Sequence, residues 1–145
     1  MSIESNKALV RRYQEAHNTN DLDMLNTIVA ADLVSHSLMP GLPAGLEGGK
    51  LVHQVAVAAF PDYHATIEDL IAEGDKVVAR MIFCGTHTGS EFMGIPPSGR
   101  PFTFSAISIF RIANGLIVEH WGEEDGLGWL QQLGAMSPAG AAQSG

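Results

Sequence analysis

The stretch from Phe104 to Leu133, FSAISIFRIANGLIVEHWGEEDGLGWLQQL, sets the architecture that we expect for this chain. Its first half predicts a hairpin of two strands, 104–112 and 116–121, because both runs are rich in β-branched and aromatic residues and an Asn-Gly pair lies in the turn between them. Beyond the second strand, glycine and acidic residues lead into a short amphipathic helix predicted over 127–133. Asp125 therefore stands at a strand-to-helix junction.

A carboxylate at such a junction has two alternative roles. The side chain of Asp125 can cap the N-terminus of the following helix, or it can point into a cavity as a functional group. The flanking Glu123 and Glu124 lie nearer the exit from the strand, where solvated carboxylates are ordinary, so they are the weaker candidates. The local sequence leaves both roles of Asp125 open.

The first half of the chain predicts helices. A first helix follows a serine cap and ends near residue 18, and its apolar residues have the spacing of one helical face. A second short helix over 22–29 leads into a brief extended piece over 32–36. We expect a third helix over 46–60, ended by Pro61.

The second half changes to strand-like periodicity. Two runs, 64–73 and 76–88, are joined by a Gly-Asp turn, and the glycine- and proline-rich segment 89–101 predicts a long loop of the kind that often carries function. Helices first and an antiparallel meander afterwards predict an α+β fold, with the helices packed on one face of the sheet. We expect one domain over residues 1–136 and a disordered tail over 137–145.

Composition limits the classes of function. The 145 residues are 46% hydrophobic and 17% charged, which is enough apolar material for a substantial core. The net charge of −8 and the lack of a basic cluster argue against nucleic acid and anionic membrane as partners. We expect a cytoplasmic protein, because the sequence shows no transmembrane stretch and no signal peptide. Cys84 is the single cysteine, so we expect no internal disulfide and interpret it as a small buried residue.

Two runs carry a resemblance to a known family: AFPDYHATIEDLIAEGDKVVARMIFCGTHTGSEFMGIPPSGR, over 59–100, and FRIANGLIVEHWGEEDGLGWLQQLG, over 110–134. With their Phe-Pro-Asp, Gly-Asp, Thr-His-Thr-Gly, Gly-Ile-Pro-Pro and Glu-His-Trp elements in this order, they resemble the SnoaL-like polyketide cyclases, which belong to the nuclear-transport-factor-2-like group. The resemblance covers about residues 7–134. It implies a cone-shaped α+β barrel, a homo-oligomer (dimer or tetramer), no cofactor, and a small hydrophobic substrate such as a polycyclic aromatic.

The resemblance also implies a chemistry. Ring closure of a polyketide ester by an intramolecular aldol step moves a proton off an activated methylene and delivers one to the ketone oxygen, and one carboxylate with raised basicity can do both. In this family that carboxylate is an aspartate, which matches Asp125 here. Phe104, Ile117 and Trp121 are apolar residues that could desolvate it, and Phe104 is also predicted to contact the substrate.

Several further residues are predicted to contact the substrate. His120 and Trp121 are neighbours on one strand, so alternation sends only one of them into the cavity. His36 and His87 occupy positions that can hold a polar pocket residue, although His87 can instead bond to loop backbone. The histidines expected to be ordinary are His17, His53 and His64. No two histidines show the i, i+4 spacing with a carboxylate that suggests zinc, so we expect no metal site.

The loop before the last hairpin and one departure from the family pattern complete the predicted site. Phe92 and Met93 would form an apolar mouth suited to a flat ligand, unless the loop simply packs on itself. Cyclases of the family tend to place Gln and His on the inward side of the strand where this chain has Ala106 and Ser108. The departure leaves Ser108 as a substrate contact and puts the transfer of any particular substrate in question.

Two other readings remain open. The same barrel supports hydroxylation-linked chemistry, dehydration and epoxide hydrolysis, but an epoxide hydrolase would need two acids bridged by an arginine, and neither Arg80 nor Arg111 evidently provides that. The barrel also serves as a non-catalytic ligand-binding module.

Overall fold

The computed structural model describes residues 2–37 and 41–135 of the chain. Its elements, in chain order, are α1 (Ile3–Asn18), α2 (Leu22–Ile28), β1 (Val29–Ser35), α3 (Gly45–Ala59), β2 (His64–Glu73), β3 (Lys76–Thr86), β4 (Pro101–Ala113), β5 (Leu116–Glu124) and α4 (Gly126–Leu133). The predicted disordered tail, 137–145, and residue 136 at the end of the predicted domain lie outside the described residues.

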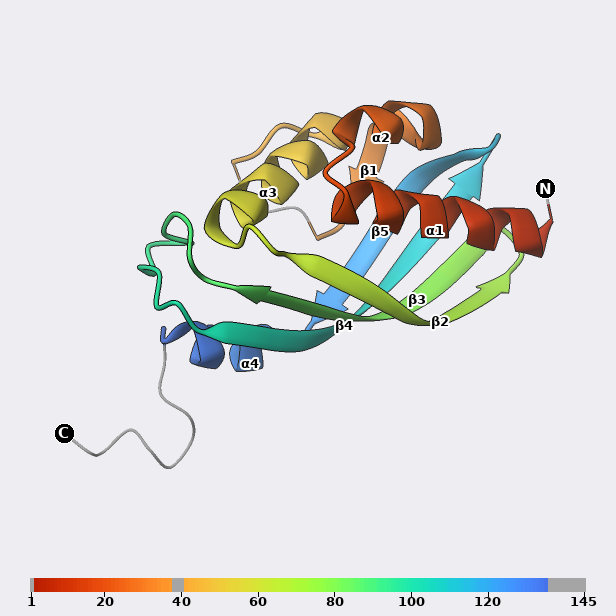
Figure 1. Cartoon of the computed structure of the whole chain (residues 1–145). Coiled ribbons are helices and arrows are strands. Elements are labelled where there is room, and N and C mark those ends of the chain that lie inside the picture. The colour runs from red at the N-terminus through yellow and green to blue at the C-terminus, as the bar shows by residue number, and fades with distance from the viewer. Residues whose placement is uncertain (1, 38–40, 136–145) are drawn as a thin grey trace.

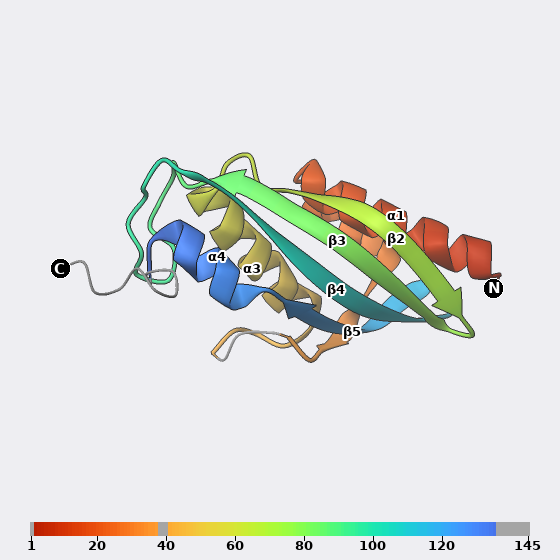
Figure 2. The ribbon, with the colours of Figure 1, turned by 90° about the horizontal axis from the view of Figure 1, so that it is seen from below.

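The five strands form one sheet in the order β1-β5-β4-β3-β2. β1 pairs with β5 in parallel, and the other three pairs are antiparallel. Figure 1 shows the long strands bending across the molecule, with α1, α2 and α3 on one side of the sheet and α4 at its end. Figure 2, seen from below, shows the other side of β3 and β4 without a covering helix over most of their length. The predicted α+β fold, with helices on a curved and mostly antiparallel sheet, is confirmed.

Local signals set the helix boundaries. Ser2 and Ser5 form a capping box at the start of α1, since the Ser2 hydroxyl accepts from the Ser5 N–H at 3.0 Å and the Ser5 hydroxyl accepts from the Ser2 N–H at 3.0 Å. Asp21 caps α2 by accepting from the Met24 N–H. Val29, predicted as the end of the second helix, instead begins β1, so this strand starts three residues earlier than the extended piece expected from the sequence.

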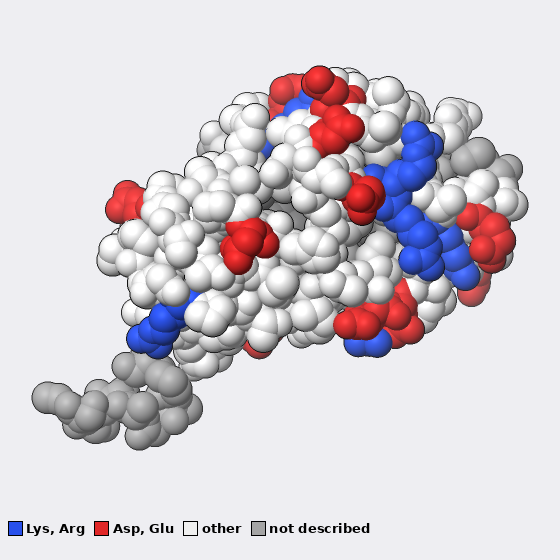
Figure 3. Space-filling model, viewed as in Figure 1, with Lys and Arg blue, Asp and Glu red and all other residues white. Residues whose placement is uncertain are grey.

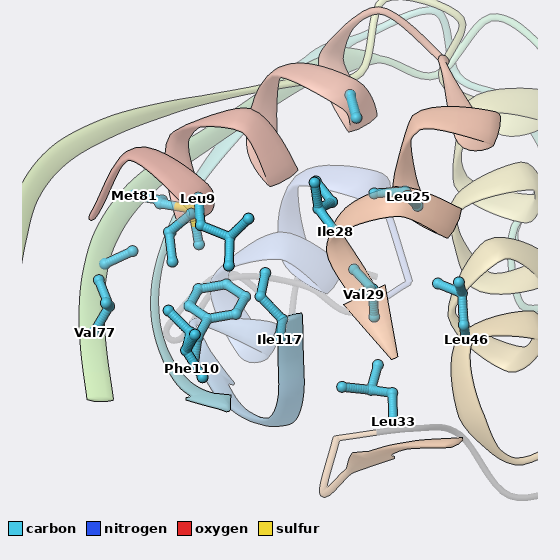
Figure 4. Close-up of a cluster of buried hydrophobic side chains, with 14 residues drawn as sticks. Leu9, Leu25, Ile28, Val29, Leu33, Leu46, Val77, Met81, Phe110 and Ile117 are labelled. Carbon is cyan, nitrogen blue, oxygen red and sulfur yellow. The ribbon is translucent and has the colours of Figure 1, made fainter. Parts of the chain in front are cut away.

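Side-chain alternation along the strands divides the core into two clusters. The aliphatic cluster lies beneath α1 and α2, where Figure 4 shows side chains of the helices meeting those of the strands. Its buried members are Leu9, Val10, Ala16, Leu25, Ile28, Val29, Leu33, Leu46, Val77, Ala79, Met81, Phe110, Ile112 and Ile117. The aromatic cluster joins the end of α3, the start of β4 and α4. Its buried members are Ala56, Ala59, Phe60, Phe92, Phe102, Phe104, Trp129 and Leu133.

The outer face of the sheet carries apolar and charged side chains together. Val78 and Ile82 on β3 belong to this face, and Ile107 on β4 is 50% exposed. Arg80 pairs with Asp69 across the β2–β3 hairpin at 2.6 Å. Figure 3 shows a different face, in the view of Figure 1, where acidic side chains flank the Lys and Arg groups and charges of both signs are interspersed.

Two sequence interpretations concern the wider surface. The prediction that Cys84 is buried is wrong: its side chain is exposed, because strand alternation turns it away from the core between inward-facing Phe83 and Gly85. Among the residues that the structure describes, no helix combines the length and the apolar character needed to span a bilayer.

The loop after β3 rests against the end of α3. The Gly89 N–H donates to the Ala59 carbonyl at 2.9 Å, and the Ser90 N–H donates to the Ala58 carbonyl at 2.9 Å. A Cβ atom at Gly89 would collide with the Ala58 carbonyl oxygen. Only glycine allows this close approach of two backbones.

We therefore expect Gly89→Ala to lower the free energy of unfolding by about 2 kcal/mol or more, because a backbone contact rather than a flexible side chain must move. Gly49→Ala is the matched control, since Gly49 lies inside α3 with open space around a Cβ. It should stabilise the protein by roughly 0.5–1 kcal/mol through helix propensity. Urea denaturation measures both, and equal effects of the two changes would contradict the role of Gly89.

Candidate active site

A cavity lies between the two clusters, enclosed by the sheet on one side and by α1 and α3 on the other. Its volume is about 190 Å³. An engineered apolar cavity of about 150 Å³ is known to hold benzene, so the enclosed space is about that of one substituted ring. Its lining consists of Tyr13, Gln14, His17, Asn18, Ser37, His53, Tyr63, Ala65, Met81, Phe83, Ala106, Ser108, Phe110, His120, Gly122, Glu123 and Glu124.

Three small residues form the floor of the cavity on β4 and β5. Ala106 and Ser108 are buried at alternate positions of β4, and Ser108 pairs in register with Gly122 on β5. Ala106 and Ser108 both face inward, as the resemblance implied. Because these side chains are small, the sheet leaves space at this point for a ligand.

His120 is the member of the His120–Trp121 pair that faces the cavity. It pairs with Phe110, whose side chain is in the core, and its imidazole lies over Gly122: a Cβ at Gly122 would be 3.2 Å from His120 Cε1. No hydrogen bond joins the His120 ring to another residue in the described ranges. Burial, with a smaller contribution from His17, lowers the pKa of His120 to about 4. The ring is therefore neutral at pH 7 and can donate or accept one hydrogen bond within the cavity.

Glu124 brings a carboxylate to the same face. It pairs with inward-facing Ala106, whereas Glu123 pairs with outward-facing Ile107 and reaches only the rim. Glu124 keeps contact with solvent, but partial burial at the mouth raises the pKa of its carboxyl group. Burial, and after it the Glu124 charge, raises the pKa of Tyr63. Glu124 is exposed, as expected of a carboxylate near the strand's exit, but its side chain also lines the cavity.

Two histidines line the helix side of the cavity, although the sequence analysis had considered both ordinary. His17 Nδ1 donates to the Tyr13 carbonyl at 2.9 Å, and His53 Nε2 donates to Asn20 Oδ1 at 2.8 Å. Their rings meet edge to face with centroids 4.9 Å apart. Burial lowers the pKa of His17, and burial together with the proximity of His17 lowers the pKa of His53 to about 4. Both imidazoles are neutral at pH 7.

Asp125 is the N-cap of α4. Its carboxylate accepts from the Gly128 N–H at 3.0 Å, and its backbone carbonyl accepts from the Trp129 N–H at 3.1 Å. It does not belong to the residues that line the cavity; it borders a shallow neighbouring depression that Arg80, Ile107 and Glu124 also line. The capping role that the sequence left open is therefore present in the structure.

His36 and Trp121 lie on the outer face of the sheet rather than in the cavity. Their rings stack with centroids 4.9 Å apart, and His36 Nε2 lies 2.7 Å from the Glu119 carboxylate, which also accepts from Arg111 at 2.8 Å. These bonds, first that from His36 and then that from Arg111, lower the pKa of Glu119. His36 and Trp121, which were predicted to contact the substrate, therefore do not line this cavity. Arg111 and Arg80 are both paired outside the cavity, away from the site that an epoxide hydrolase would need.

The four remaining predicted contacts also lie outside the cavity. His87 is fully buried under the loop that follows it, where its Nε2 donates to the Ser90 carbonyl at 2.8 Å. Phe92 and Phe104 belong to the aromatic cluster, and Met93 is 64% exposed on the loop. None of these side chains forms a mouth to the cavity, because the loop packs on Phe60 instead. Of the eight predicted substrate contacts, Ser108 and His120 line the cavity.

Several of the residues that the sequence analysis missed come from helices. Tyr13, His17 and His53 all lie on the inner faces of α1 and α3. They were missed because the inward side of a helix is predicted from its apolar residues, and these side chains are polar. Glu124 could have been predicted from strand alternation. Ser108 faces inward, its partner Gly122 on β5 shares that face, and Glu124 follows Gly122 by two residues. Within residues 2–37 and 41–135, no three His, Cys, Asp or Glu side chains are arranged to hold a metal ion.

The buried histidines should make stability depend on pH. An unfolded histidine gains a proton as the pH falls through about 6.5, whereas native His53 gains one only near pH 4, so the folded state loses stability between these values. For His53 alone the loss is on the order of 3 kcal/mol. Urea unfolding of His53→Gln at pH 7 and pH 4.5 should show a smaller loss than the unchanged protein. His64→Gln alters an exposed histidine and should keep the full loss; an identical loss in all three proteins would contradict the burial of His53 as its cause.

Comparison with known proteins agrees with the resemblance seen in the sequence. Residues 7–133 match the model of the SnoaL-like polyketide cyclase family. The chain is 31% identical over 134 residues to aklanonic acid methyl ester cyclase DnrD of Streptomyces peucetius, which covers 90% of this chain and 91% of that protein. It is 30% identical over 128 residues to the nogalonic acid methyl ester cyclase of Streptomyces nogalater, covering 82% and 90%.

A solved structure agrees with the fold. TsrD from Streptomyces laurentii superimposes with a TM-score of 0.85 at 34% identity, over 94% of this chain and 99% of that one. The sequence match and the structural match thus both extend over nearly the whole chain. The chain belongs to the SnoaL-like polyketide cyclase family.

Proposed function

We propose that this protein catalyses cofactor-free intramolecular aldol ring closure of a polyketide-type ester. Membership of a cyclase family and relatives named as methyl ester cyclases support the reaction class. The observation that carries the proposal is a carboxylate and a neutral imidazole on one face of β5: Glu124 and His120 point into the same cavity, with Gly122 between them.

Glu124 is suited to proton transfer. Its raised pKa makes the carboxylate a stronger base than an ordinary glutamate, and entry of a substrate would exclude water and raise the pKa further. In the proposed reaction the carboxylate takes a proton from the methylene between two carbonyls. The resulting enolate carbon attacks the ketone carbon and forms the new carbon–carbon bond, and the ketone oxygen then receives the proton from protonated Glu124. Atoms and charge balance without an oxidant, a reductant or a metal.

His120 is suited to stabilise the oxygen that gains charge. A neutral imidazole of lowered pKa donates a hydrogen bond without giving up its proton, as in enzymes that polarise a carbonyl with neutral histidine. Ser108 lies beside Gly122 in register and can add a hydroxyl donor. This arrangement would replace part of what the family's usual Gln and His supply on β4, where this chain has Ala106 and Ser108.

Asp125 remains the base predicted from the resemblance, and Glu124 is the base that the cavity favours. The two differ by one residue in sequence and line one shallow depression together, but only Glu124 also lines the cavity. Asp125 already accepts a hydrogen bond from the first turn of α4, whereas no hydrogen bond to another described residue occupies the Glu124 carboxylate. Substitution of each in turn separates the two assignments.

We expect Glu124→Gln to lower turnover about a hundredfold or more, because it keeps the shape and removes the proton acceptor. Asp125→Asn should keep turnover within a few-fold and change the free energy of unfolding by less than about 1 kcal/mol, since Asn caps helices nearly as well as Asp. Glu73→Gln, at the exposed end of β2 and outside the cavity lining, is the control and should keep turnover unchanged. Turnover is measured with aklanonic or nogalonic acid methyl ester in anaerobic, metal-chelated buffer.

The opposite pattern, with Asp125→Asn inactive and Glu124→Gln active, would show that Asp125 is the catalytic base. If both variants keep full activity, the proposal of carboxylate catalysis at this site is wrong. Binding of the esters without turnover by the unchanged protein would favour the non-catalytic binding module.

We also propose that the chain forms a homodimer or tetramer through the outer face of the sheet. Val78, Ile82, Ile107 and Trp121 give this face apolar area that no helix of the described residues covers. Light scattering at micromolar concentration should give at least twice the mass of one chain. Ile107→Glu should reduce it to the mass of one chain, because a charge would be buried in the contact. A single-chain mass for the unchanged protein would contradict the proposal.

A further inference from the structure

The helix side of the cavity presents two imidazole nitrogens that can only accept hydrogen bonds. We propose that His17 and His53 form a subsite for a hydroxyl group on an aromatic or enolic ring, so that a hydroxylated ring is the part of the substrate that enters the cavity. The proposal rests on the proposed function for the identity of the ligand as a substrate. Binding of such a ring requires no turnover, so the two can be tested apart.

The proton of His17 is assigned by its backbone contact. A carbonyl oxygen cannot donate, so the hydrogen bond between His17 Nδ1 and the Tyr13 carbonyl, 2.9 Å long, requires the hydrogen to be on Nδ1. In the neutral ring Nε2 then carries a lone pair. This nitrogen has no hydrogen-bond partner among the described residues.

The proton of His53 is placed by a side-chain amide, in the orientation that turns Asn20 Oδ1 toward the ring. Asn20 Oδ1 accepts from His53 Nε2 at 2.8 Å, which leaves the lone pair on Nδ1. Asn20 has a left-handed conformation, with φ of 58°, directly after α1, as is common at the end of a helix. The link ties the C-terminal end of α1 to α3 and sets the orientation of the His53 ring.

Both acceptor nitrogens remain accessible. The buried side-chain polar atoms that lack both solvent and a partner in the described residues are Asn6 Oδ1, His87 Nδ1 and Trp129 Nε1. His17 Nε2 and His53 Nδ1 are not of this kind, although His53 as a whole is only 7% exposed. Since both rings line the cavity, we infer that their open nitrogens face it.

The ligand chemistry follows from lone pairs, charge and size. Two acceptors require a donor, and a phenolic or enolic hydroxyl supplies one on a flat ring. A carboxylate would meet two lone pairs and the negative charge of Glu124 at the mouth, so an anion is disfavoured. The volume of about 190 Å³ admits one substituted ring, so a larger polycyclic substrate would extend through the mouth.

Three probes of similar size test the subsite: 4-methylphenol, 4-methylanisole and 4-methylbenzoate, titrated at pH 7 and followed by protein NMR shifts. The phenol and its methyl ether differ by the donated hydrogen. We expect the phenol to bind about tenfold more tightly than the ether, the effect of one hydrogen bond, and the benzoate to bind most weakly. Equal affinities of phenol and ether, or tightest binding of benzoate, would overturn the proposal.

Isosteric variants locate the acceptors. His17→Asn keeps a donor at the position of Nδ1 and removes Nε2, and His53→Gln keeps a donor at the position of Nε2 and removes Nδ1. A hydroxyl donates one hydrogen, so at least one of the two variants, the one that loses the acceptor in use, should reduce the preference for phenol over ether to about twofold, while His64→Gln at the exposed start of β2 should leave it at about tenfold. A thermal melt confirms that each variant is folded. An unchanged preference in both folded cavity variants would overturn the assignment.

The outcome is independent of catalysis. Glu124→Gln should keep the preference for phenol even where turnover is lost. Discrimination between phenol and ether in a protein that turns over no ester would support the subsite and reject the cyclase function. Turnover of an ester without discrimination between phenol and ether would support the cyclase function and reject the subsite.

Discussion

The alternation of side chains across the β4–β5 hairpin is the constraint on which both core and cavity depend. Inward positions of β4 hold bulky residues at both ends and small ones in the middle: Phe102, Phe104, Ala106, Ser108, Phe110 and Ile112. Gly122 extends the gap onto β5. The cavity is thus a region of missing side-chain volume between two packed clusters. A one-residue shift in register would turn this whole set outward, so the register that packs the core also opens the site.

The fold was accessible from the sequence because its signals are local. Both hairpins, the serine cap of α1 and the proline that ends α3 are short-range features, and each was predicted to within a few residues. β1 was the exception. Its parallel pairing with β5 joins segments about 85 residues apart, and its first residue, Val29, also fits the apolar stripe of the preceding helix. Long-range pairing decides such a position, and no local pattern contains it.

The site was harder to predict from the sequence than the fold, for two physical reasons. The predicted end of β5 at Trp121 hid three further residues of strand, so alternation was not followed to Glu124 and the next acid, Asp125, stood out at the junction. On helices, periodicity shows which residues share a face but not which partner that face meets. His17 and His53 were therefore indistinguishable from surface histidines until α1 and α3 were placed against the sheet. Ser108 was found because the resemblance gave its orientation.

The polar wall of the cavity weakens the fold, and this is the strongest reason to assign it a function. Burial lowers the pKa of His53 and of His120 to about 4. Each ring also keeps a nitrogen that has no hydrogen-bond partner among the described residues. These nitrogens keep contact with solvent, so they cost less than fully enclosed acceptors, but polar rings in this position still stabilise the fold less than hydrocarbon of equal size. Leucine at these positions could join the two clusters into one. A ligand that supplies the missing donors offsets the cost, whereas the carboxylate of Asp125 already has a stabilising partner in α4 and needs no ligand to account for it.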